Sequence, residues 1–225
     1  MFRRMALAAA LAATVGAAPI FAQSREPKAE VSAFAGWSFS DGVSGNSVTV
    51  PGGGGTYNRI DPKDSGMFGF TVGFLVNPEV EVGFRYSYQP SQLVAGGPSP
   101  DATLGDLSVS TYHGYFAYNF AHDTMIVPFV FGGLGATSFG SVNASLGANS
   151  RSIPGSTKFS TVWGGGVKIL PNPRVGVRVS AEWVPTYIKS DASGWWCDPF
   201  WGCYVVGNAQ YSNQFEFAGG VVFRF

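Results

Sequence analysis

The last twelve residues of the chain, from Gln214 to Phe225, alternate strictly between two faces. One face is apolar and mostly aromatic: Phe215, Phe217, Gly219, Val221, Phe223 and Phe225. A period of two residues is the period of a β-strand. An exposed apolar strand at the end of a chain would pair with other molecules through its free edge. The pattern therefore predicts a closed barrel, because there the last strand pairs with the first.

Seven further segments alternate in the same way, which brings the expected number of strands to eight. They are residues 29–39, 65–76, 79–88, 107–120, 125–139, 159–170 and 174–187. Phe68, Phe84 and Val177 belong to the apolar face that should point out of the barrel. The segment 125–139 is apolar and glycine-rich on both faces, so its orientation stays open.

The links between these segments alternate in length. Three links have about two to four residues, whereas those near 40–64, 89–106, 140–158 and 188–212 are longer and rich in Gly, Ser, Pro and Asn. Short turns at one end and long loops at the other are typical of transmembrane β-barrels. Residues 23–225 are therefore predicted to form an all-β, eight-stranded antiparallel up-and-down transmembrane barrel with four long extracellular loops.

A soluble eight-stranded barrel is the alternative, and it would place the aromatic residues inside. The interior of such a barrel is only just wide enough for ordinary side chains. Aromatic residues make up 15% of this chain, and charged residues only 12%. The composition therefore favours aromatic side chains that face lipid.

The first residues have the features of a secretory signal peptide. Arg3 and Arg4 precede an apolar stretch, Met5–Ala18, that is too short for a membrane-spanning helix. Cleavage after Ala22 is expected, so that residues 1–22 are removed. The formal net charge is zero, so the sequence lacks the excess of positive charge with which proteins bind nucleic acid.

Charged residues lie on the parity that faces the lumen, since Arg or Lys facing lipid near the bilayer midplane costs roughly 2–4 kcal/mol. Glu81 and Arg85 share one strand, and Arg178 and Glu182 share another at similar heights. Their signs are complementary, so we predict Glu81–Arg178 and Arg85–Glu182 contacts across the lumen. Two further candidate members of this ionic cluster are Glu216 and Lys168. The cluster is interpreted as a polar plug, and a gated ion path is the alternative.

Catalytic chemistry has little support in the sequence. The chain has two histidines, and His113 is followed by Gly114 and Tyr115. A His-x-Ser motif, as in an eight-stranded lipid A deacylase, therefore lacks its serine. Two histidines also leave little room for a metal site. No enzymatic activity, metal or cofactor is predicted.

The last long loop carries two cysteines, Cys197 and Cys203. In the oxidising compartment that follows secretion they are expected to form one disulfide. Aromatic residues surround and fill this small ring: Trp195, Trp196, Phe200, Trp201 and Tyr204. Clustered exposed aromatics serve as binding anchors. The alternative is that they pack on one another or join the outer aromatic girdle.

Two motifs resemble those of a known family. The stretch Pro128–Gly135 resembles a Pro-Tyr-Val-x-x-Gly-x-Gly strand, and the chain ends like the assembly signal of outer-membrane barrels. In that signal the candidate residues are Phe217, Val221, Phe223 and Phe225. The chain is similar to the small OmpA/OmpX-type and opacity-like surface proteins, the outer membrane protein beta-barrel domain family.

This resemblance implies a location in the bacterial outer membrane. The partners it implies are outer-membrane lipids, the barrel-assembly machinery and a host or envelope ligand, and a monomer is expected. It also implies a structural role or surface recognition and adhesion through the loops. A narrow low-conductance pore is the first alternative, and a lipid-modifying enzyme is the second.

Overall fold

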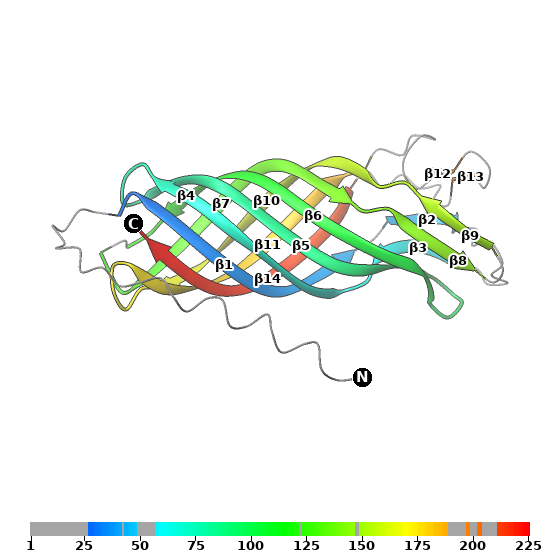
Figure 1. The fold of residues 1–225 in the computed structure, drawn as a ribbon, viewed down its shortest axis with the longest axis horizontal. Coiled ribbons are helices and arrows are strands. Elements are labelled where there is room, and N and C mark those ends of the chain that lie inside the picture. The colour runs from blue at the N-terminus through cyan, green and yellow to red at the C-terminus, as the bar shows by residue number, and fades with distance from the viewer. Residues whose placement is uncertain are drawn as a thin grey trace, which may run out of the picture.

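The computed structural model describes residues 27–41, 43–48, 57–121, 123–146, 149–188, 197–198, 202–203 and 211–225. Eight long antiparallel strands close into a barrel (Figure 1). They are β1 (Ala29–Asp41), β4 (Ser65–Leu75), β5 (Val80–Gly96), β6 (Ala102–Asn119), β7 (Ile126–Phe139), β10 (Ser156–Ile169), β11 (Val175–Tyr187) and β14 (Tyr211–Arg224). Each strand pairs with the next in this order, and the predicted eight-stranded barrel is confirmed. The expected signal peptide, residues 1–22, lies outside the described residues.

The barrel closes where β14 pairs with β1, from Glu30 opposite Arg224 to Asp41 opposite Asn213. Beyond the ladder, the Lys28 amide donates to the Phe225 carbonyl at 2.6 Å, and the Phe225 amide donates to the Ala29 carbonyl at 2.9 Å. β1 therefore begins, and β14 ends, at the end of the barrel that carries the short turns (Figure 1). This end is called the turn end, and the opposite one the loop end.

The outer wall of the barrel is apolar, as the alternation predicted. Phe68 is 55% exposed, and Phe84, Val177 and Phe217 also point outward. The structure settles the orientation of β7, which the sequence left open. Val130 and Leu134 face outward, whereas Phe129 and Phe131 are buried in the lumen. Within the described part of the chain, no helix is long and apolar enough to cross a membrane.

The long links contain strands of their own, shown at the loop end in Figure 1. They are β2 (Val43–Val48), β3 (Tyr57–Pro62), β8 (Val142–Leu146), β9 (Asn149–Ile153), β12 (Cys197–Asp198) and β13 (Gly202–Cys203). The link expected at 89–106 is mostly ladder, because β5 and β6 continue beyond β4 and stay paired. β3 pairs with the upper part of β5 and covers the edge that β4 leaves open.

Candidate functional site in the barrel lumen

The middle of the lumen holds one cation between two carboxylates. Arg85 on β5 lies 2.5 Å from Glu182 on β11 and 2.6 Å from Glu216 on β14. Glu182 and Glu216 stand directly opposite each other on neighbouring strands, so that their charges would repel without a cation. The Arg85 guanidinium also donates to the Thr111 hydroxyl and lies over the Phe34 ring. We call Arg85, Glu182 and Glu216 the central network.

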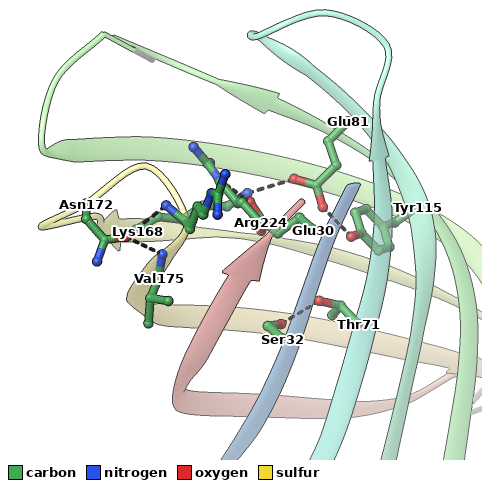
Figure 2. A network of polar contacts seen from close by, with 10 residues as sticks. Glu30, Ser32, Thr71, Glu81, Tyr115, Lys168, Asn172, Val175 and Arg224 are labelled. Carbon is green, nitrogen blue, oxygen red and sulfur yellow. Dashed lines mark hydrogen bonds and ion pairs between the residues drawn. The ribbon is translucent and has the colours of Figure 1, made fainter. Parts of the chain in front are cut away.

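A second network lies nearer the turn end, where Lys168 bridges two carboxylates (Figure 2). Its ammonium is 2.6 Å from Glu30 and 2.7 Å from Glu81. Arg224 pairs with Glu30 at 2.9 Å, and the Tyr115 hydroxyl donates to Glu81 at 2.5 Å. All of these side chains except Arg224 are buried. We call this set, together with Arg178, the turn-end network.

The predicted Glu81–Arg178 pair does not form. Lys168 stands directly opposite Arg178 on the neighbouring strand and takes the Glu81 carboxylate. The Arg178 guanidinium lies instead 4.3 Å from the centre of the Phe129 ring and 5.4 Å from that of Phe131. The correction has a physical reason: two adjacent cations compete for one carboxylate, and the buried aromatic rings of β7 offer Arg178 a second partner.

Two charged members of the turn-end network, and its Tyr115, were not among the predicted residues. Glu30 and Arg224 lie on the inward parity of the first and last strands and face each other at the closing seam. The same parity argument that selected Glu81 would have selected both. With them, the two networks together contain four carboxylates and four cations, so their charges balance as a whole.

The interior of the barrel changes character at the loop end, where buried apolar side chains form a cluster. Ten buried residues form this loop-end cluster: Tyr57, Ile60, Leu93, Ala95, Leu104, Leu107, Val109, Phe139, Val142 and Ile188. They come from β3, β5, β6, β7 and β8 and from Ile188, the residue that follows β11. The extension of β5 and β6 beyond β4 therefore has an interior core of its own.

A histidine and a serine meet in the lumen, which the search for a motif within one strand could not detect. His113 Nε2 on β6 and Ser160 Oγ on β10 lie 2.9 Å apart, and both side chains are fully buried. Thr137 also donates to the Ser160 hydroxyl at 3.0 Å. A nucleophilic serine needs a base that a third group orients. The Nδ1 atom of His113 has no hydrogen-bond partner within the described ranges, so the pair lacks that group.

The predicted residues of the last loop can be placed only in part. Trp195, Trp196, Phe200, Trp201 and Tyr204 lie outside the described residues. The backbones of β12 and β13 set Cys197 directly opposite Cys203. Opposed residues in an antiparallel ladder have Cα atoms about 4.5–5.5 Å apart, within the range that a disulfide spans. The disulfide remains a prediction.

The four residues of the expected assembly signal are exposed: Phe217, Val221 and Phe223 on the outward face of β14, and Phe225 just after its end. Their recognition during assembly stays a prediction. No group of three or more His, Cys, Asp or Glu in the described ranges is placed to hold a metal ion.

Comparisons with known proteins agree with this architecture. A family model described as "Outer membrane protein beta-barrel domain" matches residues 6–225. A comparison with curated proteins finds no match.

Three solved structures illustrate the similarity. Neisserial surface protein A is 15% identical with a TM-score of 0.54, over 88% of this chain and 97% of that one. The outer membrane protein OprG from Pseudomonas aeruginosa is 12% identical with a TM-score of 0.53, over 89% and 97%. The outer membrane protein AlkL is 13% identical with a TM-score of 0.54, over 94% and 97%. At these identities the similarity concerns the fold.

Proposed function

Because the chain belongs to the outer membrane protein beta-barrel domain family and lies in the bacterial outer membrane, we propose that it is a non-enzymatic surface protein. In this proposal the barrel is a sealed anchor, and the extracellular loops recognise ligands on a host cell or on the envelope. The outer-membrane lipids contact the apolar wall.

The observation that carries the proposal is the filled lumen. Arg85 and Lys168 each hold two carboxylates of other strands, so the charges are bound to one another. Above them, the side chains of the loop-end cluster are apolar apart from the Tyr57 hydroxyl, and hydrophobic constrictions hinder conduction by losing water. A barrel that satisfies its own interior is suited to structural support and display.

The loop-end extension supports display as well. β5 and β6 remain paired as far as Ala95 opposite Ala102, whereas the pairing of β4 with β5 stops at Phe68 opposite Tyr88. β3 adds to one side of this hairpin, and β8 packs near β6 on the other. A paired frame with a buried core loses little conformational entropy when a partner binds to its loops, which favours affinity.

The ligand-binding part is assigned to the aromatic cystine loop around Cys197 and Cys203. The cross-strand pairing of these cysteines supports a small closed ring. Aromatic side chains held in such a ring would bind a partner at low entropic cost.

The test measures binding of the refolded barrel to whole host cells and to envelope preparations. Replacing Phe200 and Trp201 with Ser should abolish binding, because these rings are the proposed anchors. A matched control, Phe159→Ser, removes an exposed aromatic from the outer wall of β10 instead. Both variants must keep heat-modifiable migration on gels. Binding that survives the loop double variant would refute the assignment, as would equal loss in the control.

An enzyme is the weaker candidate, favoured only by the contact between His113 and Ser160. Hydrolysis of a lipid by this pair would require turnover that is lost on His113→Ala. The complete burial of both side chains argues against access by a substrate.

A further inference from the structure

A groove lies on the outer wall of the barrel, and none of its lining residues belongs to the two ionic networks or to the loop around Cys197 and Cys203. It has a volume of about 700 Å³ and lies where the link between β3 and β4 runs beside β5. Its lining includes Trp37 on β1, Asp64 in the link, Tyr88 and Gln92 on β5, and Asp106 on β6. This volume lies within the range of sites for small ligands, which is about 300–1,000 Å³.

The groove lies where the lipid-facing wall ends. On the outward parity of β5, Phe84, Tyr86 and Tyr88 are followed by Pro90 and Gln92. On β6 the same change separates the aromatic Tyr112 from the polar residues at positions 106, 108 and 110. Trp and Tyr mark the membrane–water interface in membrane proteins. The groove is therefore level with the head groups of the loop-end leaflet.

Part of the groove is held in place by hydrogen bonds within the wall. The Asp64 carboxylate accepts from the Ser40 amide at 3.0 Å. The Lys63 amide donates to the Gln92 carbonyl at 2.8 Å, and the Gln92 side chain donates to Asp106 at 3.4 Å. The position of the link is thus fixed against β1 and β5, while each carboxylate keeps free lone pairs for a ligand.

The chemistry of the lining selects one class of ligand. Trp37 is 49% exposed, and Tyr88 offers a second ring at the same rim. The charged side chains are Lys63, Asp64 and Asp106, so that carboxylates outnumber cations and a phosphate would be repelled. A pyranose ring presents weakly positive C–H groups that pack on aromatic faces, and hydroxyl groups that donate to carboxylates and amide oxygens.

We propose that this groove binds a sugar unit of a glycolipid head group in the outer leaflet. A sugar of a free glycan has the same chemistry, and the experiment separates the two sources. The proposed function rests on the loop around Cys197 and Cys203 and not on this groove. A groove that binds no sugar would therefore not contradict the proposed function.

The experiment uses the refolded full-length barrel in phosphatidylcholine nanodiscs. The anchored probe is lipopolysaccharide without O-chain in the same discs, used both intact and dephosphorylated, and its binding is followed by native mass spectrometry. The free probe is its deacylated, dephosphorylated core oligosaccharide, followed by calorimetry. The variants are Trp37→Leu and Asp106→Asn, and the matched control is Trp163→Leu, an exposed aromatic on the far wall. Each variant is first checked for heat-modifiable migration.

We expect the wild-type barrel and the Trp163→Leu control to bind the probes with the same affinity. Each groove variant should bind them about tenfold more weakly. Asp106→Asn keeps the shape of an exposed side chain, so it tests the site even if Trp37→Leu does not fold. Binding of the anchored probe alone assigns the site to a membrane glycolipid, and equal binding of both probes assigns it to a soluble glycan. Equal binding by all variants, a requirement for the phosphates, or no binding to either probe overturns the proposal.

Discussion

Arg85 shows how one residue can hold three strands together in a medium that penalises charge. It is fully buried, and it reaches from β5 to carboxylates on β11 and β14. Removing one member of a buried ion pair leaves the other charge without compensation, which costs more than the pair contributes. Here two carboxylates depend on a single guanidinium.

Replacing Arg85 with Ala should therefore lower the free energy of unfolding by about 3–5 kcal/mol. Urea unfolding in lipid vesicles, followed by tryptophan fluorescence, measures it. The matched control is Arg59→Ala, because the Arg59 side chain is 46% exposed and pairs with Asp61 at 3.1 Å. Such an exposed pair contributes roughly 0–1 kcal/mol. Similar effects in the two variants would remove Arg85 from any stabilising pair, and Arg85→Ala with Glu216→Gln should recover part of the loss.

At the scale of strands, glycine sets how closely neighbouring ladders approach. A Cβ atom added to Gly135, on the inward face of β7, would collide with the Tyr112 carbonyl oxygen of β6. A Cβ atom added to Gly219, on the outer face of β14, would meet nothing within 4 Å. The two positions share a residue type but differ in the space around it.

Gly135→Ala should destabilise the barrel by roughly 1–3 kcal/mol, since the ladder must shift to admit the methyl group. Gly219→Ala should be neutral, or should stabilise by about 0.4–1 kcal/mol through the unfolded chain. The same unfolding assay compares the two variants. If both have the same effect, the close approach of β6 and β7 is not what requires Gly135.

The extension of β5 and β6 at the loop end was not predicted from the sequence, which placed a link at residues 89–106. Pro90 interrupts the pattern of β5, and proline in a run argues against a paired strand. In the structure, Gln92, on the same parity, turns its carbonyl toward the β3–β4 link. Pro90 therefore turns its missing donor toward a gap between ladders, where no hydrogen bond is lost. Only the position of β3 and β4 reveals this.

At the scale of the whole molecule, the lumen is layered. The turn-end network, the central network and the loop-end cluster follow one another along the axis. Ionic layers alone leave room for a water path between charged groups. The loop-end cluster above them favours a sealed barrel over a narrow pore, because an ion would have to cross this apolar layer without its hydration shell.

The whole barrel should therefore be electrically silent in planar bilayers. A double variant, Arg85→Ala with Leu93→Ser, shortens a central side chain and makes the loop-end cluster more polar, so it should show intermittent openings. The matched control is Phe68→Ala, which alters only the outer wall. Steady openings of the wild-type barrel would favour the pore over a sealed display scaffold.

The sequence by itself determined the eight strands of the barrel and the face that all of them except β7 turn to lipid. Alternation is local, and a strand with one apolar face has one stable orientation in a bilayer. The tertiary structure decided which inward charges pair, and that Phe129 and Phe131 lie inside. These choices depend on the stagger between strands around the closed barrel, which brings Lys168 rather than Arg178 to Glu81. Stagger is a property of the closed ring and is not encoded in any single strand.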